Sequence, residues 1–390
     1  MSLLADIREA VYALSGCCFP AHPAIKVNGR SYRIIKLLGE GGFSFVYLAE
    51  DQSGRLFAMK KIRCTFGTET VEEALKEVEM YRKFPHKNII KVLQALMYLN
   101  NSIKDTCTTN EPDQTKAVYI FLPFYRKGNL QDAINNHNLN KTHYSEKEML
   151  RIFKDVCKAI KYMHTYKVTE SSPVTITEDE EAADQMDIGQ ERSSQALLTH
   201  EESAEEPATV PVSSVETENV GEMVPYAHRD IKPGNVLIAD DGKTPILMDF
   251  GSVARARVNI TSRQQAIAQQ DLAAQQCSMP YRAPELFDVK TDTVLDEKVD
   301  IWSLGCTLYA MAYGQSPFEA NMNEQGGSMA LAVLNGQFKF PTDSELERLY
   351  GQGLRDFISW MLTINPSERP DIHQVIERAE QLLQNASEAQ

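Results

Sequence analysis

Two stretches near the middle of the chain decide the fold, "AHRDIKPGNVLI" (residues 227–238) and "ILMDFGS" (residues 246–252). Each joins polar residues to a short apolar run that predicts a β-strand, so the polar side chains are expected in turns beside two strands. Phosphoryl transfer requires a carboxylate that orients the attacking hydroxyl, a nearby positive charge and oxygen ligands for Mg2+. Only the joint spacing favours this chemistry over ordinary loop residues. The residues concerned are Asp230, Lys232, Asn235 and Asp249.

A glycine-rich stretch, "GEGGFSFVY" (residues 39–47), is expected to form a turn between two strands. Glycines there let backbone amides approach phosphate oxygens, and Val46 can cover an adenine ring. By itself such a hairpin is more often an ordinary turn. Support comes from Lys60, which alternation places on the face opposite Met59, and from Glu77 in the following helix. The lysine is expected to hold phosphates, and the glutamate to hold the lysine.

The sequence ahead of Gly128 predicts a β-sheet with one helix. Residues 70–84 carry apolar side chains at helical spacing, with acidic residues early and basic residues late, as the helix dipole prefers. Short β-rich runs bounded by turn residues predict the strands. These strands are expected at residues 32–42, 44–51, 56–62, 88–99 and 116–125.

After Gly128 the sequence changes to helical patterns. Residues 145–167 are predicted to form an amphipathic helix. The expected fold class is therefore α+β, with a small antiparallel β lobe that carries one main helix and a larger, mostly α-helical lobe. The apolar face of the predicted helix consists of Met149, Ile152, Phe153, Val156, Ile160 and Met163.

Negative charge is concentrated in one segment, residues 168–225, which contains 15 acidic residues and one basic residue. The rest of the chain has 39 acidic and 39 basic residues, and this neutrality argues against a nucleic-acid surface. The segment has no Phe, Trp or Tyr and is rich in Ser, Thr, Glu and Pro, which predicts a disordered insertion. Such a long loop adds only ~2 kcal/mol of closure entropy, so its flanks can belong to one fold.

Two interpretations of this insertion remain open. It is either a solvated loop without a partner of its own or a regulatory segment. The regulatory alternative rests on Thr177 and Ser203, whose acidic neighbours suit acid-directed kinases, and on the capacity of an acidic loop to dock basic substrates.

Cysteine usage and the N-terminal sequence indicate a compartment. The chain has seven cysteines, five of them isolated, which is not the pattern of a disulfide framework and indicates a reducing environment. The first residues are interrupted by Asp6, Arg8 and Glu9, and no run reaches the ~18 apolar residues that a membrane span needs. The body of the protein is therefore expected in the cytosol.

Cys17 and Cys18 are adjacent in "GCCFP" (residues 16–20). A disulfide between neighbours would be strained, and no nearby Cys or His has the spacing of a zinc site. They are either incidental thiols in a disordered tail or S-acylation sites. Ser2 excludes N-myristoylation, and since one acyl chain anchors only marginally, two acylated cysteines would give stable attachment. The same interpretation explains an apolar N-terminal face formed by Leu3, Leu4, Ile7, Val11 and Leu14.

The motifs resemble those of the eukaryotic protein kinase family. The resemblance covers roughly residues 32–380 without the acidic insertion, and includes "HRDIKPGN", "DFG", "YRAPE" (residues 281–285) and "DIWSLG" (residues 300–305). It implies a bilobal protein-kinase fold, ATP and Mg2+ as cofactors and proteins as substrates. The implied division is 1–24 for an N-terminal amphipathic and acylation segment, 25–122 for the N-lobe and 123–385 for the C-lobe, interrupted by 168–225.

For the catalytic residues the resemblance implies specific roles. Asp230 is the expected catalytic base, and Lys232 assists it. Asn235 and Asp249 are expected to bind Mg2+. Lys232 together with Ser278 indicates serine or threonine acceptors.

The resemblance also implies structural and nucleotide contacts. Glu285 is expected to form a buried bridge with Arg369, and Asp300 is expected to brace the catalytic loop from its own helix. Residues 122–125 are expected to form the hinge that meets adenine. The residues expected around ATP are Leu38, Gly39, Glu40, Gly41, Gly42, Phe43, Ser44, Val46, Ala58, Lys60, Glu77, Leu122, Phe124, Tyr125 and Leu237.

Two further signatures resemble the Numb-associated kinase family. One is the glycine-rich stretch with Ser44 in place of its third glycine, and the other is "SRQQAIAQQDLAAQQCSMPYRAPELF" (residues 262–287), in which residues 263–276 predict an extra helix. Within that family the chain is similar to the lipid-anchored serine/threonine kinase 16 branch and its fungal vacuolar-membrane members. Cys277 stands where a glycine is common.

The implied function is that of a serine/threonine protein kinase that transfers the γ-phosphate of ATP to protein hydroxyls. The branch implies a place on the cytosolic face of an internal membrane, vacuolar or Golgi, and a part in membrane trafficking or fusion. A pseudokinase scaffold is the alternative, which loss of a key lysine, aspartate or asparagine would favour, and all of these are present. A small-molecule phosphotransferase is disfavoured by "APE", "DIWSLG" and Arg369. The oligomeric state is not predicted.

Overall fold

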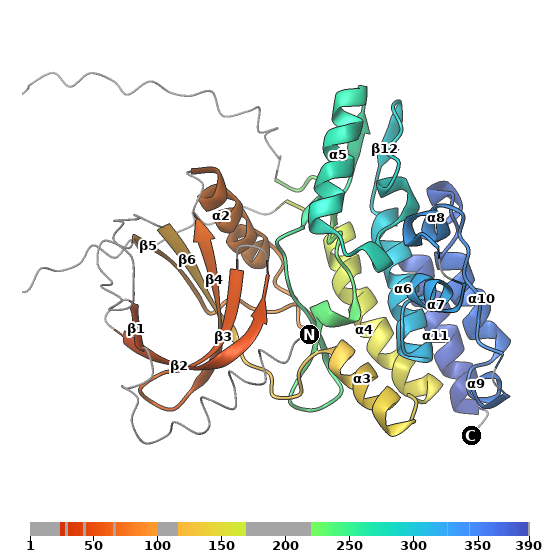
Figure 1. The fold of residues 1–390 in the computed structure, drawn as a ribbon, viewed down its shortest axis with the longest axis horizontal. Coiled ribbons are helices and arrows are strands. Elements are labelled where there is room, and N and C mark those ends of the chain that lie inside the picture. Colours follow the sequence, from red (N-terminus) through yellow and green to blue (C-terminus); the bar gives the residue numbers. More distant parts are fainter. Residues whose placement is uncertain are drawn as a thin grey trace, which may run out of the picture.

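A computed structural model describes residues 24–27, 30–41, 44–64, 68–99, 116–168, 220–325, 327–342 and 344–388. These residues form a smaller lobe built on a β-sheet and a larger helical lobe (Figure 1). The predicted α+β, bilobal fold is confirmed. Several predicted features lie outside the described residues, namely Cys17, Cys18, Gly42, Phe43, Thr177 and Ser203.

The smaller lobe is a six-stranded antiparallel sheet in the order β1-β2-β3-β4-β6-β5. All five predicted strands have a counterpart in the sheet, whereas β1 was not predicted because it is short and pairs only at the edge of the sheet. The strands are β1 (Ala24–Val27), β2 (Arg30–Glu40), β3 (Ser44–Glu50), β4 (Leu56–Cys64), β5 (Gln94–Leu99) and β6 (Lys116–Pro123).

The strand predicted over residues 88–99 is wrong in its first half, because β5 begins only at Gln94. Ile89 and Ile90 are buried, but they lie in a connection that contacts the larger lobe. The backbone N–H of Ile90 donates to the carbonyl of Leu247 at 2.9 Å. Their apolar, β-branched character therefore reflects burial between the lobes and not membership of the sheet.

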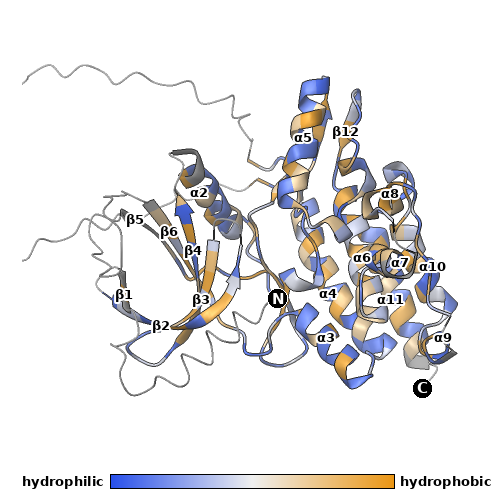
Figure 2. Cartoon of the chain, in the orientation of Figure 1, coloured by the Kyte–Doolittle hydropathy of each residue, from blue (hydrophilic) through white to orange (hydrophobic). Residues whose placement is uncertain are grey.

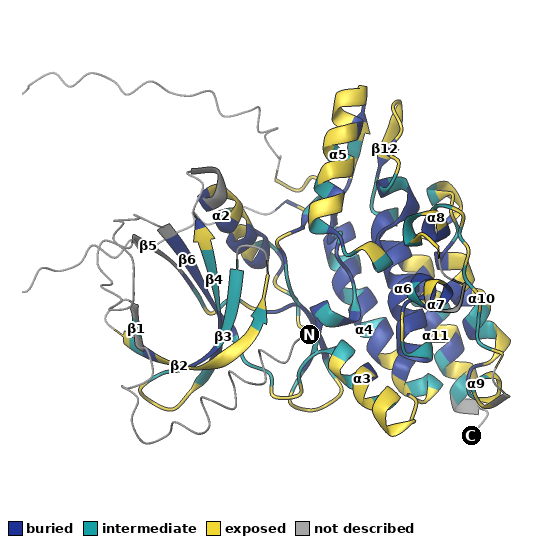
Figure 3. Ribbon diagram, viewed as in Figure 1, coloured by how far each residue is buried: buried dark blue, intermediate teal, exposed yellow. Residues whose placement is uncertain are grey.

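Helix α2 (Thr68–Lys83) covers one face of the sheet, close to the range predicted from the sequence. It turns Ala74, Val78 and Tyr81 inward, and Figure 3 shows the helix buried on its inner side and exposed on the other. Lys60 of β4 points to this helix, as alternation along the strand predicts. The helix therefore brings an acidic side chain within reach of a lysine in the sheet.

The larger lobe is mostly helical. Its short strands include β7 (Tyr226–Ala227), β8 (Val236–Ile238), β9 (Pro245–Leu247), β10 (Ala254–Arg255), β11 (Val258–Ile260) and β12 (Thr293–Leu295). Strands β8 and β9 are the two predicted around the decisive motifs, and they pair antiparallel. The helices are α3 (Leu130–Asn140), α4 (Glu146–His164), α5 (Arg263–Gln276), α6 (Lys298–Tyr313), α7 (Pro317–Gln325), α8 (Met329–Leu334), α9 (Ser344–Leu349), α10 (Gln352–Met361) and α11 (Ile372–Glu388).

Helix α6 lies at the centre of this lobe. Every residue from Val299 to Ala312 is buried, as expected of a helix surrounded by others, and Figure 2 shows hydrophobic residues in the helices of this lobe. A Cβ at Gly305 would lie 2.9 Å from Leu362 Cδ2, so glycine lets the segment after α10 approach closely. Asp300, in the first turn of α6, is thereby placed deep in the lobe.

Helix α5 is the extra helix predicted over residues 263–276, and the structure confirms it. It projects from the lobe beside β12, and most of its surface is exposed (Figures 1 and 3). Only Ala266 and Ala273 of this helix are buried. Its polar, alanine-rich sequence fits a helix held mainly at its ends, with the Ser262 hydroxyl accepting a hydrogen bond from the backbone N–H of Gln265.

The described residues that flank the predicted insertion lie side by side. The backbone N–H of Val168 donates to Glu222 O at 2.9 Å, and that of Gly221 donates to Val168 O at 2.8 Å. Residues 220–225 therefore belong to the folded lobe although the sequence places them in the insertion. Residues 169–219 lie outside the described part of the chain.

In the described part of the chain, no helix combines the length and the hydrophobicity required to cross a membrane.

Candidate active site

A cavity of about 490 Å³ lies between the two lobes. It brings together most of the residues predicted around ATP, from β2, β3 and β4 on one side and from the β6 connection and β8 on the other. Glu77 is not among the lining residues because it stands behind Lys60. The predicted residues that line the cavity are Leu38, Gly39, Glu40, Gly41, Ser44, Val46, Ala58, Lys60, Leu122, Phe124, Tyr125, Asn235, Leu237 and Asp249.

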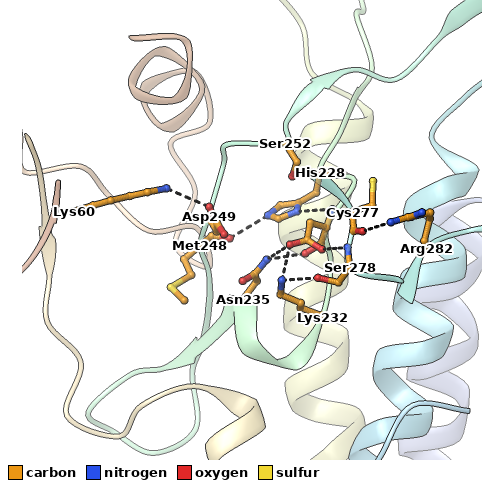
Figure 4. Close-up of polar contacts among 11 residues, drawn as sticks. Lys60, His228, Lys232, Asn235, Met248, Asp249, Ser252, Cys277, Ser278 and Arg282 are labelled. Atoms are coloured by element: carbon orange, nitrogen blue, oxygen red, sulfur yellow. Dashed lines mark hydrogen bonds and ion pairs between the residues drawn. The ribbon is translucent and has the colours of Figure 1, made fainter. Parts of the chain in front are cut away.

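Asp230 is held beside this cavity by hydrogen bonds to both carboxylate oxygens, and Figure 4 shows how its partners Lys232, Asn235 and Ser278 converge. Ser278 N donates to Oδ1 at 2.8 Å, and Lys232 Nζ donates to Oδ2 at 2.7 Å. Asn235 Nδ2 donates to Oδ2 at 2.9 Å and to the Asp230 carbonyl at 2.8 Å. Lys232 Nζ also donates to Ser278 Oγ at 2.6 Å. The predicted catalytic residues therefore form one connected network around a single carboxylate.

Asp300 holds the loop that carries Asp230 through hydrogen bonds to the backbone of that loop. The backbone N–H groups of His228 and Arg229 each donate to this carboxylate at 2.8 Å, and His164 Nε2 donates at 3.0 Å. Burial alone would raise the pKa of Asp300, but the hydrogen bonds from His164 and from the backbone N–H of Arg229 hold the pKa below its ordinary value. Asp300 therefore contacts the catalytic loop as the sequence predicts.

The loop also needs an unusual backbone conformation. Arg229 has a φ of 67°, in the left-handed region that non-glycine residues rarely adopt. The two N–H groups bound to Asp300 belong to Arg229 itself and to the preceding residue, so the carboxylate stabilises a strained turn.

Asp249 reaches the cavity from the opposite side. It too has a positive φ, 66°, while the following Phe250 is buried and packs with its ring 4.9 Å from Tyr81 and 5.4 Å from His228. The buried ring fixes the chain, and the carboxylate, 44% exposed, points into the open cavity. Although burial would raise the pKa of Asp249, the positive charge of Lys60 lowers it, so the group is ionised at neutral pH.

Lys60 connects the two lobes electrostatically. Its Nζ lies 2.6 Å from Glu77 Oε1 and 3.4 Å from Asp249 Oδ1. Burial lowers the pKa of Lys60, but the two carboxylates outweigh it and raise the pKa above its ordinary value. The predicted ion pair with Glu77 is present, and a permanent positive charge stands beside the cavity.

Glu285 and Arg369 form the predicted bridge away from the cavity. The guanidinium is fully buried and donates to the two Glu285 oxygens at 2.6 and 2.7 Å. The other hydrogen bonds go to the carbonyls of Thr363, Ile364 and Lys298 at 2.6, 2.8 and 3.1 Å. All five N–H donors of the guanidinium are thus satisfied, which a buried charge requires.

Sequence reasoning missed several supporting contacts. Ser252 Oγ donates to the carbonyl of His228 at 2.7 Å, and His228 Nε2 donates to the carbonyl of Met248 at 3.1 Å. Ser252 and His228 both lie inside the two motifs that decide the fold, so the motifs themselves were the signal that could have indicated these contacts. Arg282, which belongs to "YRAPE", contacts the carbonyl of Cys277, and nothing in the residue pattern predicts this contact.

Glu285→Gln should destabilise the fold because it leaves the buried guanidinium of Arg369 without its counter-charge. We expect a loss of about 3–5 kcal/mol in the free energy of unfolding, measured by urea denaturation. The matched control is Arg257→Gln, which breaks the exposed pair with Glu297 and should cost at most about 1 kcal/mol. Equal losses in the two variants would contradict this account of the buried pair.

Comparison with known proteins supports the family suggested by this geometry. Residues 32–170 and 224–379 match the protein kinase domain family. The intervening residues 171–223, which the family does not match, fall within the segment that the sequence predicts to be an insertion. The family match therefore covers residues of both lobes.

Individual relatives agree over most of their length. The chain is 35% identical over 353 residues to the serine/threonine-protein kinase ppk13 of Schizosaccharomyces pombe, covering 90% of each chain. It is 32% identical over 392 residues to the serine/threonine-protein kinase ENV7 of Saccharomyces cerevisiae, covering 97% of this chain and 100% of the relative. It is 30% identical over 366 residues to serine/threonine-protein kinase 16 of Mus musculus, covering 94% of each. The chain belongs to the protein kinase family, in the group that contains serine/threonine-protein kinase 16 and these fungal relatives.

Proposed function

We propose that this chain is a serine/threonine protein kinase in which Asp230 is the catalytic base and ATP binds in the cavity between the lobes. The observation that carries the proposal is the network in which Lys232, Asn235 and Ser278 fix the Asp230 carboxylate at the cavity edge. The relatives, all named as serine/threonine-protein kinases, point to the same activity.

The cavity suits a nucleotide. Its apolar part is lined by Val46, Ala58 and Leu237, which can enclose a flat ring, and the connection after β6 offers backbone groups to the ring edge. Lys60 supplies a fixed positive charge for phosphate oxygens. We therefore assign adenine to the apolar part and the phosphates to the end that holds Lys60.

Asn235 and Asp249 fit Mg2+ in the presence of a nucleotide. The side chain of Asn235 donates two hydrogen bonds to Asp230 through Nδ2, which leaves its side-chain oxygen available as a ligand. Asp249 contributes an ionised carboxylate. The part of the chain that the structure describes contains no cluster of three His, Cys, Asp or Glu ligands, which suits an ion that takes remaining ligands from phosphates and water. Mg2+ would neutralise charge on the phosphates of ATP.

The residues around Asp230 divide the remaining work. The carboxylate would orient the attacking hydroxyl and accept its proton, because hydrogen bonds to both of its oxygens hold it in one place beside Asn235 of the cavity. Lys232 would stabilise negative charge on the transferred phosphoryl group. Ser278, bound to both, lies where a protein hydroxyl would approach, which favours serine or threonine acceptors.

We further propose that acylated Cys17 and Cys18 anchor the kinase to the cytosolic face of an internal membrane, vacuolar or Golgi, where it acts in trafficking or fusion. The support is the sequence, with adjacent cysteines behind an apolar N-terminal face. Ala24, the first described residue, follows Cys18 by six residues, a span of at most ~20 Å. Acyl chains at these cysteines would therefore hold the β-sheet lobe near the membrane.

Asp230→Asn should abolish most phosphate transfer from ATP to a peptide library. Loss of a catalytic base reduces rates by about 10²- to 10⁴-fold, whereas the control Asp241→Asn, in an exposed turn between β8 and β9, should retain full activity. Transfer of labelled phosphate measures both. A wild-type protein no more active than Asp230→Asn would overturn the proposal and favour a pseudokinase scaffold.

Cys17→Ser with Cys18→Ser should release the protein from membranes. Fractionation of cells that express the full chain should show the double variant in the soluble fraction, while Cys107→Ser, which removes a cysteine outside the pair, stays membrane-bound. Hydroxylamine-sensitive acyl exchange should detect label on the wild type and none on the double variant. If the double variant remains as membrane-bound as the wild type, the anchoring proposal fails.

A further inference from the structure

Arg282 is a buried cation whose role the catalytic network does not explain. The residue is 7% exposed, and its guanidinium lies 4.8 Å from the centre of the Phe287 ring. Within the described residues its hydrogen bonds go to backbone carbonyls, from Nη2 to Cys277 O at 2.8 Å and to Ala274 O at 3.3 Å. A buried charge without a carboxylate partner is costly, so these contacts call for a reason.

The two carbonyls belong to the end of helix α5. The last carbonyls of a helix have no partners within the helix and carry its negative partial charge. The backbone N–H of Cys277 still bonds to Ala273 O at 2.9 Å, so the helix runs up to this residue. Arg282 therefore caps α5 and fixes the direction in which the chain leaves it.

The chain leaves α5 directly into the catalytic network. The carbonyl of Cys277 and the N–H of Ser278 belong to one planar peptide group, so fixing the first also fixes the second. That N–H donates to Asp230 Oδ1 at 2.8 Å, and Ser278 Oγ accepts from Lys232 Nζ at 2.6 Å. Figure 4 shows Arg282 on one side of this peptide and the Lys232 contact on the other.

Cys277 fits this arrangement in place of the common glycine. Its φ of −104° and ψ of 130° are an extended conformation that any residue adopts, so no glycine is required. A side chain at this position narrows the backbone freedom of the unfolded chain, and the buried thiol fills space beside the network. The orientation of the peptide is then set by Arg282.

We propose that Arg282 is a positioning residue for phosphoryl transfer, which orients the Cys277–Ser278 peptide so that Ser278 holds Asp230 and Lys232 in place. Arg282 does not touch the substrate or ATP in this proposal. The proposal rests on the kinase activity proposed above and adds to it a dependence on the end of helix α5. The exposed helix thereby contributes to catalysis through its last turn.

The test measures steady-state kinetics of the full chain with ATP and a peptide substrate. Arg282→Gln should lower kcat by about 10- to 100-fold, because small displacements of a catalytic group are costly. The KM for ATP should stay unchanged, since Lys60 and Asp249 are not displaced. Arg282→Lys keeps the charge but not the planar arrangement of N–H donors, so its kcat should lie between those of the wild type and Arg282→Gln. The control Arg263→Gln, at the exposed start of α5, should match the wild type.

A double-mutant cycle separates positioning from a general loss of structure. If Arg282 acts through Ser278, the double variant Ser278→Ala with Arg282→Gln loses less kcat than the product of the fold-losses in the two single variants. Independent, multiplying effects overturn the proposal, as does wild-type kcat in both Arg282 variants. The rise in melting temperature with ATP should equal that of the wild type, which shows that the variants are folded. If the wild type itself transfers no more phosphate than Asp230→Asn, the kinase proposal fails first.

Discussion

The buried carboxylate of Asp300 is the interaction on which the active site depends. It lies in the first turn of α6, the most deeply buried helix of the larger lobe, and accepts hydrogen bonds from the two residues that precede Asp230. It also binds His164 at the end of α4. A buried charge is tolerated only when its hydrogen bonds are satisfied, so this carboxylate selects one conformation of the strained catalytic loop. The same contacts explain how the chain accommodates a long segment between α4 and the loop. The end of α4, at His164, and the start of the loop, at His228, both bind the Asp300 carboxylate.

The second constraint acts between the lobes. Lys60 and Glu77 belong to the β-sheet lobe, whereas Asp249 belongs to the larger lobe, and the lysine contacts both carboxylates. The position of α2 therefore determines whether a positive charge faces the cavity. Phe250 reinforces this link because its ring packs against Tyr81 of α2 and against His228 of the catalytic loop. The charge of Lys60 and the ring of Phe250 thus set the position of one lobe relative to the other, beside the proposed phosphate site.

The sequence was most informative where chemistry requires a particular residue at a particular spacing. The network around Asp230, the pair of Lys60 and Glu77, and the contacts of Asp300 were all expected from motifs. Helix α5 was predicted from the composition of its segment and lies where expected.

Prediction failed where tertiary contacts decide the structure. The run at Ile89 and Ile90 has the character of a strand, yet it packs between the lobes. Residues 220–225 look like the rest of the acidic segment, yet backbone pairing with Val168 draws them into the fold. The contact of Arg282 with a carbonyl could not be predicted, because no motif assigns this side chain a partner. Such contacts depend on how a loop is folded and not on which residue provides the acceptor.

Hydrogen exchange at the backbone N–H groups of His228 and Arg229 tests most directly whether Asp300 fixes the catalytic loop. Both lie in a loop, but both are bonded to a carboxylate inside the protein. If the account is right, they exchange as slowly as the amides of the α6 interior, because exchange requires the lobe to open. Exchange as fast as that of the exposed turn at residues 240–243 would show that the loop moves independently of Asp300, and would contradict the account.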